Sequence, residues 1–426
     1  MATTLTERAD PGGAGDKPEK EPASAIAQAG EQRSKRLESV RALAAIGVVT
    51  AHILTLGLAY KGLVDTYPKR VLFGGGQQGL QLFFTMSGFL LFLPFVRHQV
   101  GLSKRPIDLR RYARNRMLRI LPLYFTMVTV LIAIGAYGIH RGDMWRYYLF
   151  IQEYDGASHA RLNAPMWSVA VEVQFYILLP LIALAIAKVC RRSLGRTALV
   201  LVAAGIVSFA LRSTQVLHTS HPNIIGPVTG KYALSTLFYF FAGGMLLAVL
   251  HVAWSVRGAP AWTSRRVLGS STAWIAAGVV VFFVTCWDVS WQEPWTQLSV
   301  FPIVAACVLP LRAGWATRLL EWRWLAAFGL TTFSVYLWHW PLLQAITGVH
   351  LTENASHVLT LVGDPMGFGT LWIIAMPVCA GVGIVSYFVI ERPFLSKRRG
   401  WGATAATQDA TKGDTPPAAP AGAAAA

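Results

Sequence analysis

The sequence predicts an all-α membrane protein, a polytopic bundle of about ten transmembrane helices with both termini on the cytoplasmic side. Its composition is the first reason. Of the 426 residues, 54% are hydrophobic and 14% are charged, whereas a soluble domain carries about 25% charged residues. The mean hydropathy is +0.45. The second reason is that the apolar residues form blocks long enough to cross a bilayer, about 17–25 residues each.

The apolar blocks predict ten spans that form one membrane domain over residues 36–395. In order, the predicted spans are 41–60, 78–96, 118–139, 166–187, 197–212, 232–251, 268–287, 297–311, 325–348 and 370–390. The eighth span, LSVFPIVAACVLPL, is short, and element boundaries are the least defined part of any such prediction.

The distribution of lysine and arginine sets the predicted orientation. With the N-terminus in the cytoplasm, the cytoplasmic loops hold 18 of these residues and the opposite loops hold 8. Positive loops remain on the cytoplasmic side of a membrane. The formal net charge of +17 is therefore explained by membrane topology, and it does not indicate a nucleic-acid partner.

The two ends of the chain lack the long apolar blocks of the membrane domain. Residues 1–35 are polar and lack the apolar core of a signal peptide, so they predict a disordered cytoplasmic tail. Residues 396–426, rich in alanine and proline, predict a second disordered tail. The four cysteines lie singly in or beside apolar segments, which indicates small buried side chains rather than a disulfide framework.

Away from the ends of the predicted spans, few charged or histidine side chains occur: His52, Glu172 and His339. Such a group costs several kcal/mol in lipid, so each is a functional candidate, although a polar group that only packs helices is the simpler alternative. Arg41 precedes His52 by 11 residues, about three helical turns, so both lie on nearly one face. Ser87 lies at a comparable depth. The sequence therefore allows one polar site within the bundle.

A second basic feature is RRYARNRMLRILPLY at residues 110–124. Arg116 and Arg119 are three residues apart and share a helix face. A cytoplasmic loop explains most of these cations, but an arginine that leads directly into ILPLY requires snorkelling or an anionic ligand. The phosphates of coenzyme A fit this stretch, and anionic lipid headgroups fit it as well.

At these residues the chain resembles the acyltransferase-3 family of integral-membrane O-acyltransferases, with motifs in the same order over roughly residues 36–395. The matching segments are RLESVRALAAIGVVTAH (36–52, with Arg41 and His52), LQLFFTMSGFLL (80–91, with Ser87), RNRMLRILPLY (114–124, with Arg116 and Arg119), MWSVAVEVQFYILLP (166–180, with Trp167 and Glu172), FSVYLWHWPLL (333–343, with Tyr336 and His339) and IERPF (390–394). The chain departs from the family pattern at Glu38-Ser39, at Gln81 and at Val173.

The resemblance implies that an acyl group, most often acetyl, moves from cytoplasmic acyl-CoA to a hydroxyl at the outer face. Three arginines, Arg41, Arg116 and Arg119, would hold the phosphates of coenzyme A. We expect His52 to accept the hydroxyl proton and Glu172 to orient its imidazole. The remaining candidates line the site or stabilise the oxyanion: Ser87, Trp167, Tyr336 and His339. We expect no metal and no tightly bound cofactor, only acyl-CoA as co-substrate.

Several alternatives stay open at the level of sequence. His52 could carry the acyl group covalently instead of acting as a base. A glycolipid transporter or flippase also fits a polar cluster in a helical bundle, although no paired repeat is present. We expect the acceptor to be a hydroxyl of an envelope glycolipid or glycan, for instance a trehalose mycolate, with a macrolide-type metabolite as the alternative. The expected location is a bacterial plasma membrane, and the sequence does not specify an oligomeric state.

Overall fold

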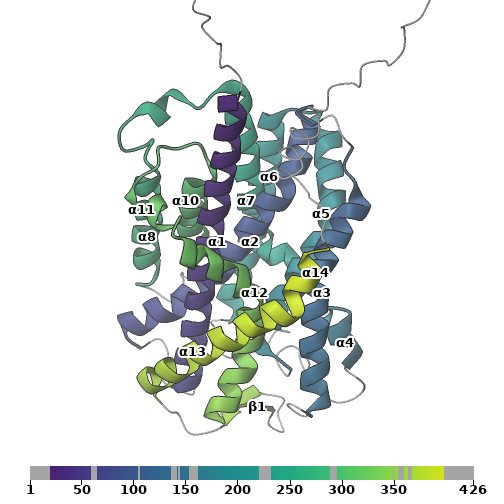
Figure 1. Ribbon diagram of the computed structural model, residues 1–426, viewed down its shortest axis with the longest axis vertical. Helices are drawn as coiled ribbons and strands as arrows, with labels where there is room; N and C mark the ends of the chain where they lie inside the picture. The colour runs from purple at the N-terminus through teal and green to yellow at the C-terminus, as the bar shows by residue number, and fades with distance from the viewer. Residues whose placement is uncertain are drawn as a thin grey trace, which may run out of the picture.

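The computed structural model describes residues 20–58, 65–103, 106–135, 142, 144–152, 162–219, 232–287, 295–348, 350–353, 359–362 and 367–397. Within these ranges the regular secondary structure is helical apart from one two-stranded hairpin and an isolated bridge between Ser270 and Arg312 (Figure 1). The hairpin joins β1 (His350–Glu353) to β2 (Leu359–Val362) in antiparallel register, with His350 opposite Val362. It lies in a segment that we expected to be a loop, so the all-α prediction needs this small correction.

Each of the ten predicted spans coincides with a helix. These are α1 (Lys20–Gly57), α2 (Tyr67–Gln99), α3 (Leu109–Ala133), α5 (Trp167–Cys190), α6 (Leu194–Thr219), α7 (Leu234–Arg257), α8 (Ser271–Thr285), α10 (Gln297–Val308), α12 (Arg323–Thr347) and α13 (Phe368–Ser386). The shorter helical segments are α4 (Met144–Tyr148), η4 (Ala164–Met166), η6 (Ala261–Ser264), α11 (Trp315–Leu319), the π-helical turn η7 (Tyr387–Glu391) and α14 (Arg392–Leu395).

The described helices include seven that are long and apolar enough to cross a membrane. Helices α8 and α10 have 15 and 12 residues, or about 22 and 18 Å of rise, less than a hydrocarbon core of about 30 Å. Helix α12 has 25 residues but contains several buried polar side chains, among them Thr332, Ser334 and His339. The membrane-protein class is therefore supported by seven helices, while the count of ten and the orientation of the termini stay predictions.

Helix α1 starts earlier than the sequence suggested. It begins at Lys20, so residues 20–35 are helical where we expected a disordered tail. The segment contains many strong helix formers, and its proline, Pro22, stands in the first turn, where a missing N–H is tolerated. Residues 1–19 and 398–426, which hold the rest of the predicted tails, lie outside the described residues.

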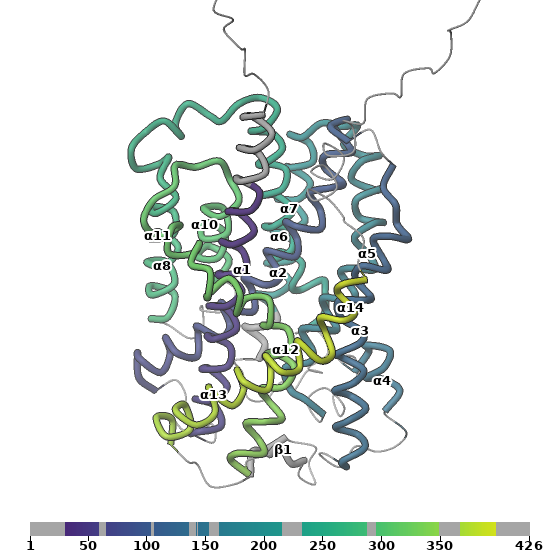
Figure 2. The backbone as a smooth tube through the Cα atoms, viewed as in Figure 1, coloured from purple at the N-terminus to yellow at the C-terminus, as the bar shows by residue number. Residues whose placement is uncertain are grey.

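Helix α1 is the central element, packed against α2, α12 and α13 (Figure 2). Two glycines allow close approach of its neighbours. A Cβ added at Gly79 of α2 would lie 2.4 Å from the Ala44 carbonyl oxygen, and one at Gly329 of α12 would lie 2.0 Å from the Glu38 carbonyl oxygen. Because both contacts are to the backbone of α1, any larger side chain would push these helices apart and move the residues they carry.

The outer helices present apolar side chains to the exterior. Ile177 and Leu184 of α5 are 67% and 68% exposed, and Ile373 of α13 is 71% exposed. A soluble protein rarely leaves large apolar patches uncovered, whereas lipid tails solvate such residues well. The four cysteines are buried, as expected for small apolar side chains. The exterior of the described bundle thus matches a hydrocarbon environment.

Candidate active site

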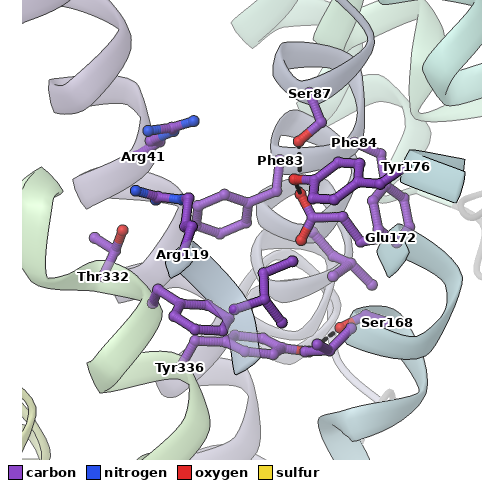
Figure 3. A pocket seen from close by; sticks show the side chains of 14 residues that line it. Arg41, Phe83, Phe84, Ser87, Arg119, Ser168, Glu172, Tyr176, Thr332 and Tyr336 are labelled. Atoms are coloured by element: carbon purple, nitrogen blue, oxygen red, sulfur yellow. Dashed lines mark hydrogen bonds between the residues drawn. The ribbon is translucent and has the colours of Figure 1, made fainter. Parts of the chain in front are cut away.

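A pocket lies where α1, α2, α3, α5 and α12 meet, and five of the predicted residues line it (Figure 3). These residues are Arg41, Ser87, Arg119, Glu172 and Tyr336. Each comes from a different helix, so the packing of the bundle brings together residues that are far apart in sequence. In Figure 3 the two arginines lie on one side of the pocket, and Ser87 and Glu172 lie on the other.

The acidic side of the pocket is organised around Glu172. Its Oε1 atom accepts a hydrogen bond of 2.7 Å from Ser87 Oγ and a second from the Tyr176 hydroxyl. Tyr176 follows Glu172 by one helical turn, so both side chains share a face of α5. The Arg116 guanidinium lies over the Tyr176 ring, 5.7 Å from its centroid. Arg116 thus supports the pocket wall without itself lining the pocket.

The basic side of the pocket contains arginines that already have carboxylate partners. Arg41 Nη1 lies 3.0 Å from Glu38 Oε1, on the same helix. Arg119 Nη1 lies 3.9 Å from Glu391 Oε1, and Arg119 also interacts electrostatically with Glu38 and Glu172. These two predicted phosphate-binding arginines are therefore held in place by acids, and their remaining N–H groups are what a ligand can use.

His52 and His339 form a direct pair, which we call the histidine pair. His52 Nδ1 lies 2.9 Å from His339 Nε2, and the rings stack with centroids 5.0 Å apart and planes 29° apart. The edge of Trp340 meets the His52 ring at 5.2 Å between centroids. His339 is fully buried, while His52 is half-buried. The pair therefore has one anchored member and one partly accessible member.

The hydrogen bonds of the pair define which nitrogen of His52 is basic. His339 Nδ1 lies 2.5 Å from the Tyr336 carbonyl oxygen, and because a carbonyl can only accept, Nδ1 carries the proton. In a neutral His339 the other nitrogen, Nε2, is then an acceptor. His52 Nδ1 must donate to it, which leaves the lone pair of a neutral His52 on Nε2. This arrangement suits a general base.

The expected contact between Glu172 and His52 is not formed among the described residues. Glu172 binds Ser87 and Tyr176, and the orienting partner of His52 is His339. The physical reason is that depth along a helix does not fix the direction in which a side chain points. Two side chains at similar depth in the membrane can therefore lie on helix faces that do not meet. Our expectation that a carboxylate orients His52 is thus corrected, and a backbone carbonyl fills that role through His339.

Tyr336 connects the pocket to the histidine pair. Its ring lines the pocket, and its carbonyl accepts from His339. Its hydroxyl lies 2.6 Å from Ser168 Oγ and 2.8 Å from the Pro165 carbonyl oxygen. Trp167, the remaining predicted residue, lies outside the pocket lining and packs against Phe84, with ring centroids 6.4 Å apart. One tyrosine therefore couples the two parts of the site.

Sequence reasoning missed several residues of this site: Glu38, Ser168, Tyr176 and Glu391. Tyr176 could have been found from its one-turn spacing after Glu172. Glu38 could have been found from its three-residue spacing before Arg41, whereas the partners of Glu391, Ser334 and Arg119, lie on other helices. Within the described residues no group of three or more His, Cys, Asp or Glu side chains could hold a metal ion.

The family described as "Acyltransferase domain" matches residues 34–392. The chain is 24% identical to "Putative peptidoglycan O-acetyltransferase YrhL" of Bacillus subtilis, covering 84% of this chain and 54% of that protein. It is 22% identical to O-acetyltransferase OatA of Staphylococcus aureus, covering 85% of this chain and 57% of that protein.

A third relative is closer to this chain in length. "Putative membrane-bound transacylase BcsY" of Komagataeibacter xylinus is 24% identical over 75% of this chain and 76% of its own length. The chain spans a little over half the length of the two O-acetyltransferase relatives. No solved structure matches the chain. The shared part is therefore the helical domain, which contains the pocket and the histidine pair.

Proposed function

The chain belongs to the acyltransferase-3 family, and from this premise we propose that it is a membrane O-acyltransferase. The proposed reaction moves an acyl group, most often acetyl, from a cytoplasmic acyl-CoA to a hydroxyl of the bacterial cell envelope. The observation that carries this proposal is the chain of contacts from the Tyr336 carbonyl through His339 to His52. It supplies an oriented neutral base in an apolar bundle.

In the proposed step, the acceptor hydroxyl oxygen attacks the carbonyl carbon of the thioester. The hydroxyl proton passes to His52 Nε2 as the new C–O bond forms, because a hydroxyl is a poor nucleophile until a base takes its proton. The C–S bond breaks, and the leaving sulfur of coenzyme A takes the proton from the imidazolium. The products are an ester and free coenzyme A, and His52 returns to its neutral form.

The pocket supplies the proposed donor-binding groups. Arg41 and Arg119 line it, and arginine binds phosphate through several N–H groups in a fixed geometry. Arg116 reinforces the wall through Tyr176. Because both pocket arginines have nearby acids, the pocket bears little net charge before the donor arrives. The arginines are thus held in position without the like-charge repulsion of an unpaired cluster.

The acceptor we propose is a glycan hydroxyl of the cell envelope. Two relatives carry the name O-acetyltransferase, one of them with peptidoglycan as the stated acceptor, and this favours a glycan over a macrolide-type metabolite. A glycolipid such as a trehalose mycolate remains within the same chemistry, since it also offers a sugar hydroxyl. The histidine pair favours transfer over a flippase, since a transport pathway needs no oriented base.

The test uses the purified full chain in lipid nanodiscs with labelled acetyl-CoA and envelope glycan fragments. We expect release of the coenzyme A thiol and acetylated fragments by mass spectrometry, both lost in His52→Ala. The exposed His98 offers a matched control, because His98→Ala should retain activity. Wild-type protein that neither consumes acetyl-CoA nor acetylates any fragment would overturn the proposal.

The same assay separates a direct base from a covalent histidine intermediate. A base transfers acetyl only when the acceptor is present, whereas an acyl-histidine forms from acetyl-CoA alone. We expect no labelled protein after incubation with acetyl-CoA without acceptor. Label that stays on the wild-type chain but not on His52→Ala would replace the base mechanism with the covalent one.

A further inference from the structure

The C-terminal motif IERPF (390–394) has no role in the mechanism above, yet its glutamate is buried beside the pocket. Glu391 is 1% exposed and ends the π-helical turn η7 (Tyr387–Glu391) between α13 and α14. Helix α13 crosses the bundle obliquely, and α14 reaches α3 (Figure 1). A carboxylate removed from water in this way needs partners of opposite charge or hydrogen-bond donors.

The sequence explains why the helix widens at this position. Pro393 has no N–H, and its ring would clash with the carbonyl four residues earlier in a regular α-helix. The chain instead forms a wider turn in which the Arg392 N–H bonds to the Tyr387 carbonyl, five residues back. Because the turn contains one extra residue, the Glu391 side chain points in a different direction from the one it would have in a regular α-helix. Such π-turns occur frequently at functional sites.

Two contacts define where the Glu391 carboxylate points. Oε2 accepts a hydrogen bond of 3.0 Å from Ser334 Oγ of α12, and Oε1 lies 3.9 Å from Arg119 Nη1 of α3. The serine fixes one oxygen, so the other faces the arginine. Three helical segments that are remote in sequence are therefore linked through one carboxylate at the edge of the pocket.

We propose that Glu391 is a positioning residue that holds the Arg119 guanidinium toward the pocket, where it binds the anionic part of the acyl donor. This inference rests on the proposed function. The separation of 3.9 Å orients and compensates the cation but leaves its N–H groups available to a ligand. By contrast, Arg36 and Glu321 form a closed pair at 2.6 Å, which suits a purely structural bridge.

The opposite role makes the opposite prediction. If Glu391 were a competitor that occupies Arg119 until the donor displaces it, removing its charge would strengthen donor binding. If it is a positioning residue, removing its charge lets Arg119 turn away, and donor binding weakens. The sign of the change in KM for acetyl-CoA therefore distinguishes the two roles.

The experiment measures KM for acetyl-CoA and kcat for Glu391→Gln in the full chain. We expect KM to rise about tenfold, the loss of one charged hydrogen-bonding interaction, while kcat changes less than about twofold because the histidine pair is untouched. Glu321→Gln serves as the matched control, since it also removes one acid from an arginine pair but away from the pocket, and its KM should not change.

A double variant adds a readout that a purely structural role would not produce. In an Arg119→Gln background, Glu391→Gln should raise KM no further, because the group it positions is already gone. Ser334→Ala, a milder change, should raise KM about two- to fivefold through the freed carboxylate, and it keeps the test valid if Glu391→Gln fails to fold.

An unchanged or lowered KM in both Glu391→Gln and Ser334→Ala, with active wild-type protein, would overturn the positioning role alone. The positioning role would also be overturned if the KM increases of Arg119→Gln and Glu391→Gln multiplied in the double variant, because the two residues would then act independently. Wild-type protein that does not bind or consume acetyl-CoA would instead overturn the proposed function, and this inference with it.

Discussion

The pocket and the histidine pair both contact Tyr336, but they differ in the charge of their side chains. In the pocket every predicted ionic group has an opposite charge or a hydroxyl beside it, as Arg41 has Glu38 and Glu172 has Ser87. In the histidine pair the two imidazole rings contact each other, and a backbone carbonyl accepts from one of them. Binding an anionic donor requires retained charge, whereas accepting a proton requires a neutral base, so the two regions are built for different steps.

This comparison makes a general prediction. Substitutions in the histidine pair should lower kcat with little effect on KM for acetyl-CoA, and substitutions in the pocket should do the reverse.

His52→Ala should have the largest effect because it removes the proposed base. We expect kcat to fall about 10³-fold or more, since general base catalysis contributes about 10²–10⁴-fold. The measurement is acetyl transfer at saturating acetyl-CoA. Activity within tenfold of wild type, with His98→Ala equally active, would remove His52 from the chemistry.

His339 offers a sharper test of orientation because its two replacements should differ. In His339→Ala, His52 loses the acceptor for its Nδ1 proton, and we expect kcat to fall about 10²-fold. In His339→Gln the side-chain oxygen can accept that proton, so kcat should recover by about tenfold over the alanine variant. Equal losses in the two variants would argue that His339 only fills space.

Arg119→Gln should act on donor binding. We expect KM for acetyl-CoA to rise about 10- to 100-fold with kcat changed less than about threefold, because a hydrogen bond to a charged group contributes about 1.5–3 kcal/mol. The exposed Arg318 provides the control Arg318→Gln. A fall in kcat at unchanged KM would show that Arg119 acts in the chemical step and not in donor binding.

Ser87→Ala should have the smallest effect. It removes one hydrogen bond to Glu172, but Tyr176 still donates to that carboxylate. We expect kcat/KM to fall about three- to tenfold. Ser255→Ala is a suitable control, since its hydroxyl bonds only within its own helix, to the Val252 carbonyl. An effect as large as that of Arg119→Gln would give Ser87 a direct role in donor binding.

Much of the fold could be predicted because apolar blocks long enough to cross a bilayer form helices. All ten predicted spans coincide with helices. The departures come from local chemistry that hydropathy does not report. Helix α1 extends to Lys20 through polar helix formers, and Pro393 widens the turn that carries Glu391. Strands β1 and β2 form because they pair with each other, and the composition of this segment does not predict that pairing.

The sequence proposed several residues that the structure brings together, but it did not predict which of their side chains touch. Ionisable residues in apolar spans pointed to His52, Glu172 and His339, and all three belong to the site described above. The sequence supplied depth along each helix, but a contact also depends on which helix faces lie opposite. For this reason Glu172 was expected at His52, while His339 occupies that position. Glu391 was missed because its partners Ser334 and Arg119 are remote in sequence, whereas Glu38 stands only three residues before its partner Arg41.

The most direct test of the central claim measures donor binding and acetyl transfer in one preparation of His52→Ala. The chain in nanodiscs is titrated with acetyl-CoA for its Kd and then given acceptor for the transfer rate. The separation of pocket and histidine pair predicts a Kd within about twofold of wild type and no detectable transfer. A lost Kd, or transfer at the wild-type rate, would contradict the claim that the pocket binds the donor while His52 performs the proton transfer.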